Sequence, residues 1–283
     1  MKKLLVFFSV GLFVFPCLES CKKFMNPDEE IPSYIYVPAC TFSADTINQG
    51  TRIQKISDVW VFKGNDFLGA FPIGAKIPVL AEGNTEIKMR AGIKNYGIGD
   101  LRAIYPITQF YDVNVDLKRG EVVNMTPDFS YFSGITFIKL ESFSSPGTFL
   151  TQSLSSDTML VSYTGPEAMP GQGACAYVHL DSTYQVFEAL SGFPHPYVQG
   201  AITYLEINYK SNVDIAIAVS NGINDVRTVC RLKASATWNK MYAPLTEALN
   251  APSTLSNFFF VIHAVAANNN ADIYFDNIKI IKQ

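Results

Sequence analysis

The chain has 283 residues, a formal net charge of −3 and 17% charged side chains. This mildly acidic balance excludes the basic footprint of a nucleic-acid-binding protein, so no nucleic-acid partner is expected. The 21 Phe and 14 Tyr residues, together with short runs of Val, Ile and Thr, favour strands over helices, and the length fits one large or two medium domains.

Residues 1–20 have the pattern of a secretory leader. Lys2 and Lys3 precede an uncharged apolar run at residues 4–16, which is shorter than the roughly 20 residues of a membrane-spanning helix and fits a signal peptide. The run leads into the motif Leu-Glu-Ser-Cys that ends at Cys21. This motif resembles the lipobox of bacterial lipoproteins. The resemblance implies cleavage before Cys21, lipidation of its thiol and attachment to a membrane; an ordinary secreted protein with an incidental Cys21 is the alternative.

Residues 21–30 form the lipidated cysteine and a tether in this interpretation. The stretch is polar, contains Pro27 and ends in three acidic residues at 28–30, so we expect no packed structure there. Acidic residues after the lipidated cysteine resemble the surface-export signal of Bacteroidota lipoproteins. That resemblance implies a lipid-anchored outer-membrane protein facing the cell surface, with a periplasm-facing orientation as the alternative.

Residues 31–130 are predicted to form a β-sandwich, because short alternating runs are separated by turn residues. The predicted strands are 33–37, 58–62, 67–71, 77–80, 87–91, 113–117 and 122–126. Residues 61–69 and 77–87 resemble the PEGA-type module, a small β-sandwich of bacterial envelope proteins. The resemblance implies a scaffolding or interaction unit without catalytic residues. The glycine-containing stretch 91–106 is predicted to be a connecting loop.

Residues 131–283 are predicted to form a second all-β domain, a jelly roll, since many strands follow one another with little helix between them. The predicted strands are 135–141, 158–163, 174–180, 203–210, 213–219, 226–232, 258–266 and 271–281, with a short helix at 245–250. Strands 203–210 and 213–217, joined by Ser211 and Asn212, are predicted to form a hairpin.

The end of the chain carries a second resemblance. Residues 272–280 resemble the closing strand of galactose-binding-like and carbohydrate-binding jelly rolls, and residues 238–245 resemble another strand of those folds. The resemblance implies a glycan ligand and a structural calcium ion held by Glu141 and Asp276, since calcium prefers oxygen ligands. The alternative is that Asp276 only turns or caps the last strand.

The candidate ligand-binding residues are Phe193, His195 and Tyr197, which lie on a loop containing two prolines. The alternative is that Phe193 and Tyr197 pack this loop onto the sheet. Trp238 is predicted to be a core residue because it lies in a regular strand. Glu206 alternates with apolar neighbours and is therefore predicted to face solvent.

Catalytic motifs and local His or Cys metal-binding patterns are absent from the sequence. His179, His195 and His263 have no His or Cys at the spacing of a local metal site, and no nucleophile elbow or paired carboxylates are visible. We therefore expect a protein that is not an enzyme. Cys175 and Cys230 either pair in an oxidising compartment or are small buried apolar residues.

Together these patterns predict an all-β, lipid-anchored protein of the cell envelope: an Ig- or PEGA-like sandwich followed by a jelly roll that binds a glycan. The alternative function is a structural or protein-interaction accessory of an outer-membrane secretion or adhesion assembly, and an enzyme acting on glycans is a third reading. The expected partners are a membrane, through the anchor, and a glycan or an envelope protein.

Overall fold

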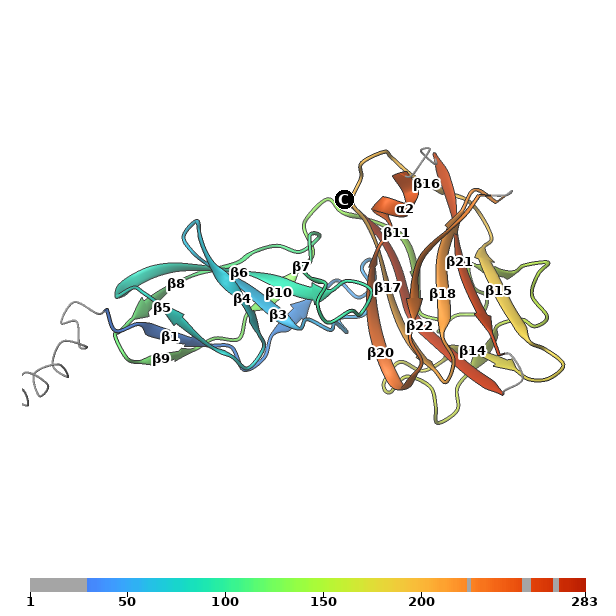
Figure 1. Cartoon of the computed structure of the whole chain (residues 1–283), viewed down its shortest axis with the longest axis horizontal. Helices are drawn as coiled ribbons and strands as arrows, with labels where there is room; N and C mark the ends of the chain where they lie inside the picture. The colour runs from blue at the N-terminus through green and yellow to red at the C-terminus, as the bar shows by residue number, and fades with distance from the viewer. Residues whose placement is uncertain (1–29, 223–224, 251–255, 267–269) are drawn as a thin grey trace, which may run out of the picture.

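The structure is a computed structural model that describes residues 30–222, 225–250, 256–266 and 270–283. It is almost entirely β, which confirms the predicted fold class. Strands β1–β10 form an elongated first half and strands β11–β22 form a second half beside it (Figure 1). Cys21 and its leader lie outside the described residues. Within those residues, no helix has the length and apolar character needed to cross a membrane.

The first half contains a five-stranded sheet of order β4-β3-β6-β7 with β8 on β6, a three-stranded sheet β5-β1-β9, and the pair β10-β2. Alternation in β3 explains its packing, because Val59 and Val61 point into the core while Trp60 and Phe62 point outward. The strands are β1 (Ser33–Tyr36), β2 (Thr41–Ser43), β3 (Asp58–Lys63), β4 (Asp66–Pro72), β5 (Lys76–Val79), β6 (Gly83–Lys94), β7 (Arg102–Ile104), β8 (Tyr111–Leu117), β9 (Val122–Asn124) and β10 (Asp128–Ser130).

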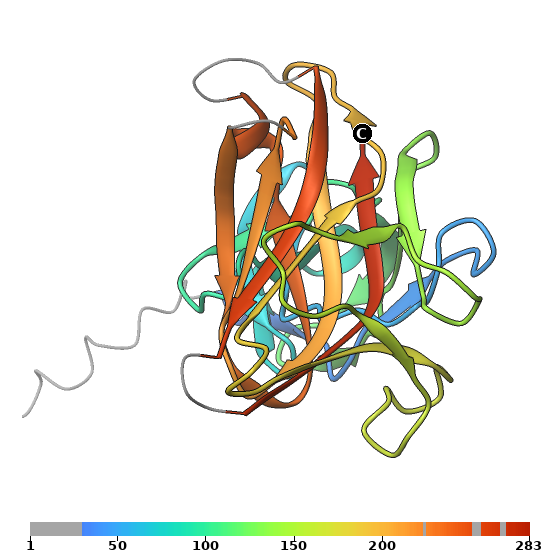
Figure 2. The same ribbon diagram turned by 90° about the vertical axis from the view of Figure 1, so that its right-hand side faces the viewer.

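The second half is a sandwich of two six-stranded sheets, which lie side by side in Figure 1 and overlap face-on in Figure 2. We call β13-β14-β22-β17-β20 with β11 the junction sheet, because it faces the first half (Figure 1), and β12-β15-β21-β18-β19 with β16 the distal sheet. The large apolar core lies between them. The elements are β11 (Thr136–Glu141), β12 (Leu150–Gln152), β13 (Val161–Tyr163), β14 (Cys175–Leu180), β15 (Val186–Ser191), β16 (His195–Pro196), β17 (Thr203–Ser211), β18 (Ile215–Ser220), β19 (Val226–Leu232), β20 (Ser235–Pro244), α2 (Thr246–Asn250), β21 (Asn257–Val265) and β22 (Ala271–Lys282).

The hairpin predicted at residues 203–217 is wrong. Strand β17 pairs with β20 and β22, whereas β18 pairs with β19 and β21, so the chain crosses from the junction sheet to the distal sheet. The Ser211 hydroxyl holds this corner by accepting from the Val213 amide at 3.1 Å and donating to the Val213 carbonyl at 2.8 Å. Alternation sets which side chains point inward, and a hairpin and a sandwich corner both preserve it.

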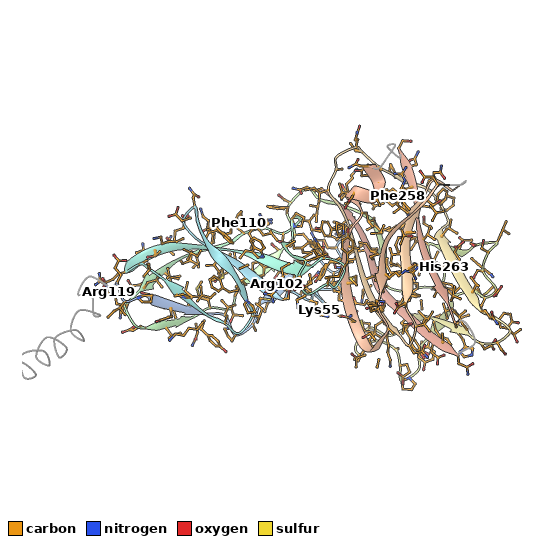
Figure 3. The ribbon with its side chains drawn as sticks, in the orientation of Figure 1. Lys55, Arg102, Phe110, Arg119, Phe258 and His263 are labelled. Atoms are coloured by element: carbon orange, nitrogen blue, oxygen red, sulfur yellow. The ribbon has the colours of Figure 1, made fainter. Side chains whose placement is uncertain are left out.

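The first half packs end-on against the outer face of the junction sheet. Tyr204, Tyr242 and Ile281 of that sheet belong to the apolar cluster of the first half. The Lys55 amide donates to the Tyr242 hydroxyl at 2.7 Å, and the Lys55 ammonium donates to the Asn239 side chain at 2.5 Å. Figure 3 shows Lys55 at the end of the first half that meets the second. Apolar and polar contacts therefore join the two halves.

The stretch 91–106 is more than a connector. Strand β6 continues to Lys94, and the following turn reaches the junction sheet, where the Tyr96 amide donates to the Tyr242 carbonyl at 2.8 Å. A Cβ at Gly97 would lie 2.9 Å from the end of the Met241 side chain, so glycine permits this close approach.

Glu206 lies at the centre of the junction and is fully buried, so its predicted solvent exposure is wrong. The hydroxyls of Tyr105 and Tyr131, both from the first half, donate to one carboxylate oxygen at 2.6 Å each. The ammonium groups of Lys240 and Lys279 lie 2.5 and 3.9 Å from the other oxygen. Burial by itself would raise the pKa of Glu206, but the two lysines and these hydrogen bonds outweigh it and lower the pKa to about 2.

Replacing Glu206 should destabilise the whole chain. In Glu206→Ala, two buried ammonium groups lose their counter-charge, which costs about 3–5 kcal/mol of unfolding free energy. Urea denaturation followed by circular dichroism measures this loss. The matched control is Glu82→Ala, which removes the exposed ion pair with Arg119 and should leave stability unchanged. Equal effects of the two substitutions would contradict the role given to the buried cluster.

Candidate functional site

The part of the junction sheet that the first half leaves uncovered carries four aromatic side chains on its outer face. Tyr177 and Tyr274 are cross-strand partners on β14 and β22, and their rings stack with centroids 4.9 Å apart. The Tyr163 ring lies 5.4 Å from both, and the Trp238 ring lies 6.4 Å from Tyr274. We call these four residues the aromatic face. Their neighbours along β14 and β22 point into the core, which sets the outward direction of the tyrosines. Tyr177 is half-buried, whereas Tyr274, enclosed by the other three rings, is only 8% exposed.

Charged and polar groups border the aromatic face. The Asp272 carboxylate accepts from the Tyr177 hydroxyl at 2.6 Å and lies 2.9 Å from His179 Nδ1. The Lys210 ammonium pairs with Glu167 and lies 5.8 Å from the centre of the Tyr274 ring. A shallow pocket of about 300 Å³ opens between these groups, lined also by Asn212 and Ser235. Hydrogen-bond donors and acceptors therefore stand directly beside the rings.

The surroundings of Tyr177, Tyr274 and Asp272 shift the pKa values of these three side chains. Burial raises the pKa of Tyr274 to about 12 and, together with the Asp272 hydrogen bond, raises that of Tyr177. Both phenols are therefore neutral hydrogen-bond donors at neutral pH. Partial burial opposes ionisation of Asp272, but the hydrogen bonds from Tyr177 and His179 outweigh it and lower the pKa of the carboxyl.

The loop 164–173 frames the aromatic face. Its Glu167 carbonyl accepts from the Trp238 indole N–H at 3.0 Å, so Trp238 is half-buried on the outer face and its predicted core position is wrong. At Gly165 a Cβ would lie only 2.3 Å from the Tyr163 hydroxyl, which means that glycine lets the loop fold against that ring.

The loop residues predicted to bind a ligand do not form one exposed surface. Phe193 is 81% exposed, whereas His195 and Tyr197 are buried. The His195 ring packs 5.5 Å from Phe258, and the Tyr197 hydroxyl donates to Asn250 at 3.0 Å. Of these three residues, only Phe193 is accessible to a ligand.

Glu141 and Asp276, predicted to hold calcium, lie near each other. The Glu141 carboxylate accepts from the amides of Phe143 at 2.8 Å and Phe149 at 3.2 Å. Asp276 is fully buried; Oδ1 accepts from the Asn277 amide at 2.7 Å, while Oδ2 has no hydrogen-bond partner among the described residues. Burial, reinforced by the Glu141 charge, raises the pKa of Asp276 to about 7.

These two carboxylates supply only part of a calcium site, since calcium takes six to eight oxygen ligands. The described residues contain no group of three or more His, Cys, Asp or Glu side chains that could hold a metal. The unpartnered oxygen of Asp276 is the one feature here that favours a cation.

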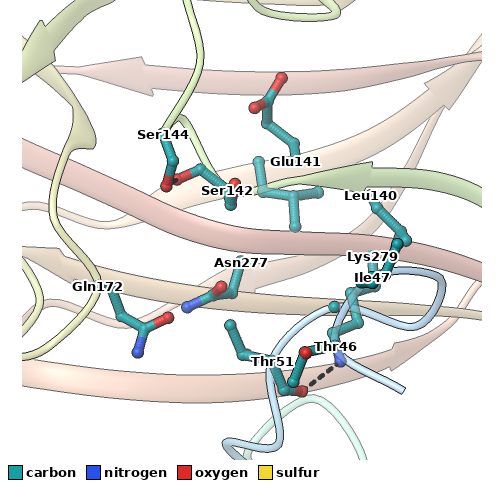
Figure 4. A pocket seen from close by; sticks show the side chains of 12 residues that line it. Thr46, Ile47, Thr51, Leu140, Glu141, Ser142, Ser144, Gln172, Asn277 and Lys279 are labelled. Carbon is teal, nitrogen blue, oxygen red and sulfur yellow. Dashed lines mark hydrogen bonds between the residues drawn. The ribbon is translucent and has the colours of Figure 1, made fainter. Parts of the chain in front are cut away.

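A second pocket, of about 270 Å³, lies where the 46–51 loop of the first half meets the end of β11 and residues 277–279 of β22 (Figure 4). The Lys279 ammonium closes one side by donating to the Thr51 carbonyl at 2.7 Å. Hydroxyl and amide groups, including Gln172 and Asn277, contribute to its lining, and Glu141 points away from it (Figure 4). The residues that line this pocket include no aromatic ring.

The three cysteines of the described residues are free thiols. Cys175 is fully buried in β14, while Cys40 and Cys230 are half-buried, and burial raises the pKa of all three. Cys175 and Cys230 do not form a disulfide.

No protein-family model matches the chain, and no curated protein matches it. Solved carbohydrate-binding modules resemble about half of it. A lysine-to-alanine variant of a family 29 carbohydrate-binding module is 13% identical over 53% of this chain and 92% of its own, with a TM-score of 0.36. A family 29 module complexed with mannohexaose is 12% identical over 52% and 91%, with a TM-score of 0.37. TmCBM61, in complex with β-1,4-galactotriose, is 13% identical over 50% and 92%, with a TM-score of 0.33.

Proposed function

We propose that the aromatic face binds a glycan. The observation that carries this proposal is the group of half-buried rings, Tyr163, Tyr177 and Trp238, packed around the buried Tyr274. Asp272 and Lys210 border this group. A sugar ring presents polarised C–H groups on its faces, which the negative face of an aromatic ring attracts. It presents hydroxyls on its edges, which form strong hydrogen bonds with charged groups. The aromatic face offers both kinds of contact within one surface.

The same geometry favours binding without turnover. Asp272 is engaged by Tyr177 and His179, and Glu167 is engaged by Lys210. These partners keep both carboxylates in place beside the rings, where they can orient a ligand. We therefore propose a binding module, in preference to a glycan-acting enzyme.

A glycan array probed with the full-length chain in mild detergent should show binding to at least one class of oligosaccharide. Tyr177→Ala and Trp238→Ala should each weaken that binding by roughly tenfold or more, because each removes a ring that stacks on the sugar. Isothermal titration with the best ligand from the array measures the change.

Phe193→Ala is the matched control, since it removes an aromatic ring that is 81% exposed at a different place on the second half. It should leave binding unchanged. If Phe193→Ala abolishes binding and Tyr177→Ala does not, the ligand site is the loop around Phe193. If no glycan binds, the proposed function is wrong.

A lipid anchor at Cys21 and a cell-surface location in the outer membrane are the second part of the proposal, supported by the leader and the motif Leu-Glu-Ser-Cys. Cys21→Ala should move the protein from the membrane fraction to the soluble fraction, because the acyl chains supply the attachment. Cys17→Ala, at the neighbouring cysteine of the leader, should leave the fractionation unchanged. Retention of Cys21→Ala in the membrane fraction would refute the anchor.

A structural calcium ion beside Glu141 and Asp276 is a secondary proposal, supported by the unpartnered Asp276 oxygen. The pKa of Asp276, about 7, lies above its ordinary value of about 3.9. Its contribution to stability is therefore present at low pH and lost as the pH rises through 7. At pH 8 without calcium, Asp276→Asn should raise the unfolding free energy by about 1–3 kcal/mol, with a smaller effect at pH 5.

Adding calcium to the protein tests directly whether a cation binds beside Asp276. At pH 8, millimolar calcium should raise the melting temperature of the wild type relative to a chelator, and it should not raise that of Asp276→Asn. A wild type that does not respond contradicts the calcium proposal. Destabilisation by Asp276→Asn in the chelator would instead contradict the effect of burial on the carboxyl.

A further inference from the structure

The first half carries a separate aromatic cluster on the outer face of its five-stranded sheet. We call Trp60, Phe62, Phe67 and Phe110 the apolar patch. Trp60 stacks on Phe67 with centroids 5.4 Å apart, Phe62 lies 5.1 Å from Phe67, and Phe110 lies 5.9 Å from Phe62. Phe67 and Phe110 are 51% and 45% exposed, and Figure 3 shows Phe110 on the outside of the first half. Trp60 and Phe62 are half-buried and join the two exposed rings into one group. Exposed apolar groups that form a patch are characteristic of interaction sites.

Arg90 sits inside this patch without a counter-charge. It is the cross-strand partner of Trp60, and its guanidinium carbon lies 4.6 Å from the Phe110 ring centre and 5.6 Å from that of Phe132. No carboxylate of the described residues forms an ion pair with it; its hydrogen bonds are two long ones to backbone carbonyls, at 3.4 and 3.5 Å. Arg90 Nε and Trp60 Nε1 are both buried donors with no partner in the described chain.

The nearby acidic side chains do not compensate Arg90. Glu86 lies four residues before Arg90 on β6, and Asp112 lies opposite Lys88 on β8. Both pair with Lys88, at 3.2 and 3.9 Å. The buried Arg90 Nε and Trp60 Nε1 are enclosed by the protein, but the terminal nitrogens of Arg90 make only the two long hydrogen bonds and are therefore left to an external acceptor. A carboxylate is the best complement, because it accepts two parallel hydrogen bonds from a guanidinium.

The apolar patch differs chemically from the aromatic face. Phe62, Phe67 and Phe110 carry no polar group, so this patch offers a sugar fewer hydrogen-bonding groups than the aromatic face, which carboxylate, ammonium and hydroxyl groups border. Apolar side chains of a protein partner have no hydrogen bonds to give up when they are buried on such a surface. Trp and Arg are common anchors of protein interfaces. We propose that the apolar patch docks a protein partner that presents a carboxylate, from Asp, Glu or a chain end, flanked by aromatic or aliphatic side chains. This site lies on the other half of the molecule and is independent of the proposed glycan site.

A phage-displayed random peptide library, panned on the full-length chain in mild detergent, tests the chemistry of the partner. The enriched peptides should contain an acidic residue next to aromatic or aliphatic ones. Their affinity should fall by roughly tenfold or more in Arg90→Gln and in Phe67→Ala, because each removes one half of the complementary surface. The matched control is Arg119→Gln, which removes a cation at the far end of the first half (Figure 3) and should change nothing.

A charge exchange separates docking from a folding defect. Arg90→Glu should lose the acidic peptides and bind a peptide whose acidic residue is replaced by lysine. Enriched peptides that lack acidic residues, or that bind Arg90→Gln as well as the wild type, would overturn the proposal. Two other outcomes would also overturn it by assigning another occupant. These are polygalacturonate binding that depends on Arg90, which indicates an acidic glycan, and dimerisation that Phe67→Ala abolishes, which indicates a second copy of the chain.

Discussion

A buried carboxylate shared by the two halves is the constraint on which this arrangement depends. Glu206 and its two lysines come from the junction sheet, and the two hydroxyls that donate to it, those of Tyr105 and Tyr131, come from the first half. Charges buried without such partners cost several kcal/mol each. The cluster therefore exists in a satisfied form only when the first half is in place, which makes the two halves one structural unit.

This junction also determines where binding can occur. One sheet face carries both the Glu206 cluster and the aromatic face, and the first half covers the former and leaves the latter open. The turn at Tyr96 and the contacts of Lys55 fix the boundary between covered and uncovered parts. A glycan on the aromatic face and a protein on the apolar patch would thus be held at a fixed geometry relative to each other.

The sequence predicts the all-β class and most strands, because alternation and turn residues are local signals. Strands 58–62 and 67–71 are an example, since the turn residues around Gly64 that separate β3 from β4 lie within one short stretch. Alternation along the strand also places Tyr274 on the other face of the sheet from Ile273 and Phe275. This pattern is the one sequence signal that could have predicted the aromatic face. Alternation cannot show what covers an outward face. Glu206 and Trp238 were mispredicted for that reason: the first half buries Glu206, while Trp238 remains at the surface.

Differential scanning calorimetry of the full-length chain tests the central claim most directly. If the Glu206 cluster joins the halves into one unit, the chain should unfold in a single transition with equal calorimetric and van't Hoff enthalpies. Two separate transitions, with the second half melting at its own temperature, would contradict the account.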